Sequence, residues 1–274
     1  MIIQSIVQSI IQPIVRSVID PIIISQGFSP KSLFASGEQG AWYDPRDLST
    51  MFQDAAGTTP VTAAGQPVGL IRDKSGRGNH ASQVTAGSKP MLRNTGALWY
   101  LQFDGIDDFL ATGNIDFTQT DKIGVFSGMN KNTNAATGIF VETSLNTNTN
   151  NGCFYLAAPV TTGMATVTFN PKGTAQTSVT INLPAASNTV LTAQSDISGS
   201  MATMRKDGVA AGSSSSSQGS GNYGNYPLYI GRRGGTSLPF TGYLYGLIIR
   251  GALTDAAGIT STEKYLAAKS GVTL

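Results

Sequence analysis

The chain has 274 residues, 18 of them Lys or Arg and 16 Asp or Glu, so charged residues make up only 12% and the formal net charge is +2. This balance excludes the clustered basic charge on which nucleic-acid binding depends, and we expect no nucleic-acid partner. One cysteine and one histidine exclude an intrachain disulfide and a zinc site of the Cys/His type. The 32 glycines and the shortage of charged helix formers favour an all-β fold with many turns.

Residues 1–24 repeat a four-residue pattern of two β-branched apolar residues followed by two mostly polar ones. So short a segment cannot bury its aliphatic side chains internally, and they need a surface to pack against. The segment can either cover a hydrophobic patch of its own domain or associate with other subunits, and we favour the second interpretation. The polar interruptions exclude a membrane span. The predicted anchoring arm therefore uses Ile2, Ile3, Ile6, Val7, Ile10, Ile11, Ile14, Val15, Val18 and Ile19.

Residues 25–39 are rich in turn formers and are predicted to be a linker, with one domain over residues 40–274. Short β-branched and aromatic runs then recur between Gly, Asn, Asp and Ser clusters, which predicts an antiparallel β-sandwich or jelly roll. In the last run both sets of alternating side chains are apolar, which indicates a strand buried on both faces. Only 260–269 has a helical pattern. The predicted strands lie in 98–103, 123–127, 138–141, 153–156, 165–169, 189–192, 228–230 and 243–249.

Two motifs carry a resemblance to a known fold. Residues 73–81 read Asp-Lys-Ser-Gly-Arg-Gly-Asn-His-Ala, and residues 101–110 read Leu-Gln-Phe-Asp-Gly-Ile-Asp-Asp-Phe-Leu. With the final strands and short helix, their order resembles the laminin-G-like, concanavalin A-like sandwich domains over roughly residues 42–271. The sequence Ala-Trp-Tyr-Asp-Pro-Arg-Asp at 41–47, the glycine-rich loops and the repetitive arm also resemble laminin-G-like structural proteins of tailed bacteriophages and prophages.

The resemblance to phage proteins implies a location and a set of partners. It implies a virion structural protein at the particle surface, as a capsid decoration, head fibre or tail-associated adhesin. The arm would then bind other virion proteins. Fibres and decorations of similar phages are often trimeric, so a homo-oligomer, and a trimer in particular, is implied; no heptad pattern supports it.

The acidic residues of both motifs have two interpretations. Asp104 and Gly105 form a turn signal, in which glycine supplies a positive φ and the carboxylate accepts from nearby backbone N–H groups. Alternatively, carboxylate oxygens bind Ca²⁺, which some members of the resembled family do. We favour turns over metal and expect no other cofactor. The calcium candidates are Asp73, Asp104, Asp107 and Asp108.

Catalytic patterns are scarce. The glutamates Glu38, Glu142 and Glu263 lie outside the Glu-x-Asp-x-Glu pattern of sandwich-fold glucanases, and no Gly-x-Ser-x-Gly elbow accompanies His80. We therefore expect a protein that is not an enzyme. A carbohydrate-active enzyme or a specific lectin module is the alternative.

One segment has the composition of a recognition loop. Tyr223, Asn225 and Tyr226 lie beside Gly and Asn, which suits stacking on a sugar ring while amides donate hydrogen bonds. Packing of these tyrosines at the edge of the sandwich is equally open. The sequence thus predicts a virion protein that displays a lectin-like sandwich and binds a host-surface glycan.

Overall fold

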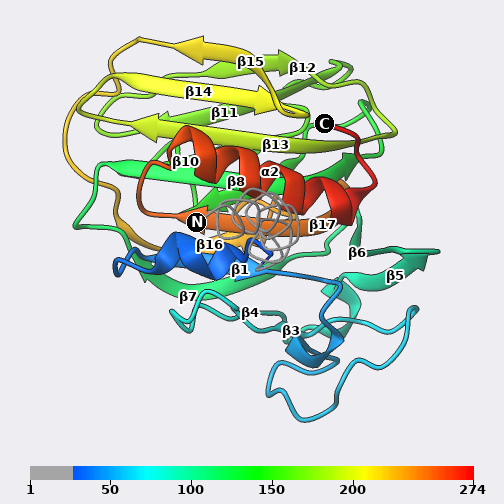
Figure 1. Cartoon of the computed structure of the whole chain (residues 1–274). Helices are drawn as coiled ribbons and strands as arrows, with labels where there is room; N and C mark the ends of the chain where they lie inside the picture. Colours follow the sequence, from blue (N-terminus) through cyan, green and yellow to red (C-terminus); the bar gives the residue numbers. More distant parts are fainter. Residues whose placement is uncertain (1–26) are drawn as a thin grey trace, which may run out of the picture.

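The computed structural model describes residues 27–274 and shows two antiparallel sheets packed face to face (Figure 1). The predicted all-β sandwich is confirmed. The anchor residues between Ile2 and Ile19 lie outside the described residues, as do the first two residues of the predicted linker. Within residues 27–274, no helix is both long and apolar enough to cross a membrane.

The first sheet has eight strands in the order β15-β14-β13-β8-β17-β6-β5, with β1 also paired to β17. Its long central strands hold apolar side chains on both faces, as predicted for 243–249, because each face is covered by other elements. The strands are β1 Gly40–Tyr43, β5 Met91–Thr95, β6 Leu98–Asp104, β8 Lys122–Lys131, β13 Ser187–Asp196, β14 Met201–Lys206, β15 Val209–Ser214 and β17 Thr241–Arg250.

The second sheet has nine strands in the order β12-β11-β10-β9-β16-β7-β4-β3-β2. Its inner side chains interdigitate with those of the first sheet and form the main core, which includes Phe103, Phe140, Phe154, Phe169 and Phe240. The strands are β2 Met51–Phe52, β3 Leu70–Ile71, β4 Ala81–Ser82, β7 Leu110–Asp116, β9 Ile139–Thr143, β10 Cys153–Ala157, β11 Thr166–Lys172, β12 Val179–Asn182 and β16 Asn225–Ile230.

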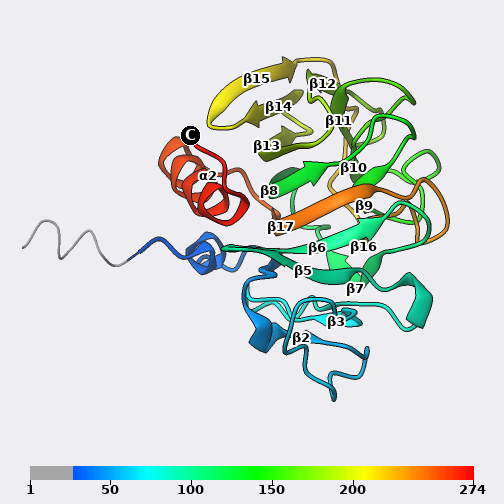
Figure 2. The same cartoon turned by 90° about the vertical axis from the view of Figure 1, so that its right-hand side faces the viewer.

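A second core lies on the outer face of the eight-stranded sheet. Helix α2 (Ala256–Ser270) and the 3₁₀ helix η1 (Pro30–Phe34) pack there, on the same side of the molecule (Figure 2). Two shorter 3₁₀ helices, η2 (Leu48–Thr50) and η3 (Ala86–Ser88), lie in loops. The second core contains Leu33, Phe34, Trp42, Phe126, Val190, Ile248, Leu266 and Ala267.

The structure corrects two boundaries that the sequence predicted, the end of the linker and the start of the helix. Residues 30–34 were predicted to belong to a linker, but Leu33 and Phe34 are buried, so this part of the segment is packed structure. The helix predicted from residue 260 begins at Ala256, because the carboxylate of Asp255 caps it by accepting a hydrogen bond from the Gly258 N–H at 2.8 Å.

Candidate functional site

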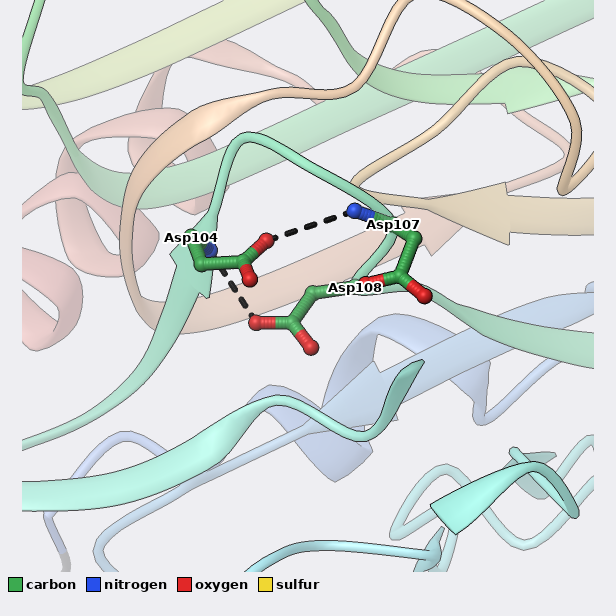
Figure 3. Close-up of side chains that lie close together, drawn as sticks. All are labelled: Asp104, Asp107 and Asp108. Atoms are coloured by element: carbon green, nitrogen blue, oxygen red, sulfur yellow. Dashed lines mark hydrogen bonds between the residues drawn. The ribbon is translucent and has the colours of Figure 1, made fainter. Parts of the chain in front are cut away.

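The turn between β6 and β7 gathers three carboxylates (Figure 3). Asp104 Oδ1 accepts from the N–H groups of Ile106 at 2.8 Å and Asp107 at 3.3 Å, and Asp108 Oδ2 accepts from the Asp104 N–H at 3.0 Å. Gly105 has φ +79°, and a Cβ there would lie 1.9 Å from Oγ1 of Thr241, so only glycine fits. The predicted Asp-Gly turn is confirmed.

The same three side chains are also suited to a cation. One carboxylate oxygen from each of Asp104, Asp107 and Asp108 lies within 4.8 Å of the other two. Burial of Asp108, together with the neighbouring charges of Asp104 and Asp107, raises its pKa to about 7. A divalent cation would relieve this repulsion, and carboxylate oxygens are ligands that Ca²⁺ prefers. These residues therefore fit a calcium site.

Asp73, the fourth calcium candidate, lies elsewhere. Its Oδ1 accepts from the N–H groups of Trp42 at 2.9 Å and Ser75 at 2.8 Å, and its Oδ2 accepts from the Asn79 N–H at 3.1 Å. Trp42 is paired with Ile248 of β17, whereas Asp104 is paired with Thr241 at the other end of that strand. Seven residues of strand span about 23 Å. The grouping of Asp73 with the other three is therefore wrong, and its carboxylate organises a loop instead.

A cavity of about 230 Å³ opens beside the acidic cluster. Asp104 and Asp108 line one part of it, and Gln102, Arg93 and Lys89 line another. Gln102 Oε1 accepts a hydrogen bond from Arg93 Nε at 2.7 Å, and Lys89 Nζ donates to the Gln53 carbonyl at 3.0 Å. The cavity, which we call the rim pocket, thus offers both donors and acceptors to a polar ligand.

The three predicted glycan-binding residues do not lie together on one surface. Tyr223 is only 2% exposed and belongs to the main core, where its ring lies 6.4 Å from that of Phe154, edge to face. No face of its ring is free for a sugar, so its predicted role is wrong. Asn225 is exposed and Tyr226 is partly exposed, at the start of β16. Asn225 pairs with Asp116 at the far end of β7, so these residues do not join the rim pocket.

The sequence did not predict the buried ion pair between Glu142 and Arg233. Glu142 of β9 is fully buried; its Oε2 accepts from Arg233 Nε at 2.9 Å, and its Oε1 accepts from the Thr147 N–H at 2.9 Å. Burial raises the pKa of Glu142, although Arg233 opposes the change. The guanidinium of Arg233 also lies 5.1 Å from the centre of the Tyr155 ring. In the sequence, the only sign of this pair is that Glu142 follows an apolar run. Arg233 is 91 residues away, so no local pattern connects the two residues.

The other chemically reactive candidates have structural partners. His80 Nδ1 accepts a hydrogen bond from the Asp73 N–H at 3.0 Å. Burial raises the pKa of the Cys153 thiol to about 11. Glu38 is paired with Arg250 and Glu263 with Arg205, so each glutamate of the chain has its own arginine.

No protein-family model matches this chain, and no curated protein matches its sequence. Among solved structures, the receptor-binding domain of botulinum neurotoxin type G has a TM-score of 0.54 and 11% identity, covering 71% of this chain and 48% of its own. A structure of botulinum neurotoxin type C, whose cell entry depends upon interaction with two ganglioside molecules, has a TM-score of 0.56 and 8% identity, covering 84% and 51%. The binding domain of botulinum neurotoxin DC in complex with SialylT has a TM-score of 0.53 and 8% identity, covering 81% and 52%. This chain thus spans about half the length of these binding domains, with which it shares the β-sandwich fold.

Proposed function

We propose that this chain is a non-enzymatic, glycan-binding component of a bacteriophage virion, attached to other virion proteins by residues 1–24 and displaying its sandwich outward. The resemblance of the sequence to laminin-G-like phage proteins supports the virion role. The ganglioside and SialylT named for the neurotoxin structures support a carbohydrate ligand. The observation that carries the proposal is the rim pocket, which lies at an edge of the sandwich beside three carboxylates.

The rim pocket has the chemistry that sugar hydroxyls require. Each hydroxyl both donates and accepts, and the pocket supplies acceptors on Asp104 and Asp108 and donors on Arg93 and Lys89. Met91 adds an apolar wall on which the C–H face of a sugar ring can pack.

The test of glycan binding uses an array of bacterial surface polysaccharides. We expect the full chain to bind a subset of them, and we expect Arg93→Ala to weaken that binding about tenfold. Arg46→Ala is the matched control, because Arg46 is exposed and does not line the pocket. Cleavage of a bound polysaccharide would instead support the alternative of a carbohydrate-active enzyme.

The virion role has its own test. A chain that lacks residues 1–24 should fail to enter phage particles assembled in its presence, whereas the full chain should be incorporated at the particle surface. Normal incorporation of the shortened chain would refute the anchoring role of the arm.

A further inference from the structure

A row of side chains crosses the outer face of the nine-stranded sheet. The strand register places Asn170 of β11 opposite Tyr155 of β10, Tyr155 opposite Glu142 of β9, and Glu142 opposite Tyr229 of β16. The adjacent residues Phe154, Leu156, Leu228 and Ile230 belong to the main core, so the row faces away from it. Directly opposite side chains lie about 5 Å apart. We call Asn170, Tyr155, Glu142 and Tyr229 the outer row.

The outer row is polar and yet largely buried. Asn170 is 2% exposed, Tyr155 is 8% exposed and Glu142 is fully buried, while Tyr229 is partly exposed. The side chain of Arg233 contacts the row at Glu142 and Tyr155. Burial of the Glu142–Arg233 ion pair costs desolvation energy that a solvated outer face would avoid. The fold therefore maintains a costly polar arrangement at this position.

Two buried polar groups at the row have no hydrogen-bond partner among residues 27–274. The Asn170 side chain accepts at Oδ1 from Gln176 Nε2 at 3.1 Å and from Ser178 Oγ at 2.5 Å, but its Nδ2 has no acceptor. Ser144, two residues beyond Glu142, is fully buried, and its Oγ is also unpartnered. Such groups are rare in folded proteins, because each one forfeits the hydrogen bonds it made to water. A bound molecule that reaches the row would supply the missing partners.

The loops beside the row are conformationally strained. Ser144 has φ +82° and Leu238 has φ +50°, values that side chains other than glycine seldom adopt. Leu238 follows Arg233 in the same loop and packs against the small cluster that contains Tyr155. Backbone strain of this kind is concentrated at ligand sites, where surrounding contacts maintain it.

The charges at the row favour an anion. Lys172 Nζ donates to the Thr147 carbonyl at 2.7 Å, and Arg233 Nη2 donates to Thr147 Oγ1 at 3.4 Å, so two cations meet at one residue. The facing carboxylate is that of Glu142, which leaves an excess of one positive charge among these three groups. An unpaired amide donor and a positive excess call for a ligand that carries acceptors and negative charge.

We infer that the outer row, together with Arg233, is a second glycan site that takes carboxylate-bearing sugars. This inference rests on the proposed function, since it assumes a carbohydrate ligand. Tyr229 supplies a partly exposed ring face for a sugar, Asn170 supplies the unpaired N–H, and Arg233 with Lys172 supplies the charge. Rearrangement of the exposed side chains of Gln176 and Ser178 would open a route to Asn170.

The test is calorimetric binding of the full chain to two acidic probes, trigalacturonate and sialyllactose, with maltotriose and lactose as their neutral counterparts. We expect each acidic probe to bind at least about tenfold more tightly than its neutral counterpart. Tyr229→Leu should weaken acidic-probe binding about three- to tenfold through loss of stacking. Asn170→Asp should weaken it more, because it replaces the donor by a negative charge. Tyr243→Leu is the matched control, because Tyr243 is also partly exposed but lies on β17 of the other sheet, and it should leave binding unchanged.

The outcomes separate this inference from the proposed function. Thermal unfolding of each variant first establishes that it is folded. Glycan binding that is lost in Arg93→Ala but unchanged in Tyr229→Leu and Asn170→Asp would overturn the second site and leave the rim pocket standing. Equal affinity for acidic and neutral probes, or a bound water alone at Asn170 in crystals soaked with either acidic probe, would also overturn it. Absence of binding to every polysaccharide and probe would refute both proposals.

Discussion

Lys131 is a buried lysine whose charge lowers the stability of the folded chain. It is fully buried in β8, its Nζ donates to the Thr166 carbonyl at 3.1 Å, and no ion pair of the described residues includes it. Burial lowers its pKa from 10.5 to about 8. Because a charged ammonium is costly in this position, the native chain carries a penalty that an apolar residue would remove.

We expect Lys131→Met to raise the free energy of unfolding by about 1–3 kcal/mol at pH 7. Between about pH 8 and pH 10.5 the unfolded chain holds the Lys131 proton more firmly than the folded chain, so native stability should rise with pH in that window. Below pH 8 both states are charged and the penalty is complete. Urea unfolding at pH 7 and pH 9.5 measures both effects, and the variant should lose this rise. A destabilised variant at pH 7 would contradict the prediction.

The acidic cluster makes a second prediction at this scale. We expect 10 mM Ca²⁺ to raise the free energy of unfolding by about 1–3 kcal/mol, as for a weak extracellular site. Asp104→Asn should abolish most of this increase. Asp73→Asn should lower the melting temperature through its loop contacts but preserve the increase, since Asp73 lies at the other end of β17. A melting temperature that a calcium chelator leaves unchanged would reduce the cluster to turn chemistry.

Sequence patterns located the Asp-Gly turn but could not assign the tyrosines. Tyr223 and Tyr229 are separated by six positions in a segment of similar composition, yet the first is in the main core and the second is on the outer face. Tyr223 precedes β16, whereas Tyr229 lies within it, after a bulge in the pairing of β16 with β7, so simple alternation of faces along one strand does not place the two side chains. The Glu142–Arg233 pair was equally hidden, since a contact between residues so far apart depends on topology.

At the scale of elements, one buried carboxylate links helix α2 to the end of β1, in addition to the contacts of the second core. Asp44 follows β1 and accepts from Lys269 Nζ at 2.8 Å and from Tyr265 Oη at 2.9 Å. Lys74 approaches the same carboxylate at 3.5 Å. Asp44 is 5% exposed, so it screens two lysine charges in a mostly buried position.

We expect Asp44→Ala to lower the free energy of unfolding by about 2–4 kcal/mol, because Lys269 and Tyr265 would lose their buried acceptor. Asp255→Ala, which removes only the N-cap of α2, should cost about 1 kcal/mol. Chemical unfolding of both variants measures the difference. Equal losses would show that the Asp44 contacts contribute no more than an ordinary helix cap.

Most strands with strong β-branched or aromatic character were located from the sequence, although β1 and β12 were missed, and several weak ones were not located. β15 contains Val209, two alanines, a glycine and two serines, and β7 contains Gly113, Asn114 and Asp116. Their local preference for strand is low. They form strands because β14 pairs with β15, and because β16 and β4 flank β7. Tertiary pairing of this kind has no local signature.

For the whole molecule, the two cores bear on whether the N-terminal arm is needed for folding. Among the described residues, the main core and the second core take in side chains between Phe28 and Val272. The second core covers the outer face of the central strands of the eight-stranded sheet with α2 and η1. We therefore expect the sandwich to fold without the arm's aliphatic side chains.

We expect a chain that begins at Gly27 to unfold cooperatively, with a melting temperature within a few degrees of that of the full chain. We expect the full chain to self-associate and the shortened chain to remain monomeric. Calorimetry and light scattering at matched concentrations measure the two properties. Ile6→Asp combined with Ile10→Asp in the full chain is the control, since it disrupts the apolar repeat without shortening the chain, and it should abolish association equally. A fall in melting temperature of more than about 10 °C, or about 3 kcal/mol, would show that the arm covers its own domain. The aliphatic repeat would then be part of the fold and not a means of attachment, because its side chains would already be buried within one subunit.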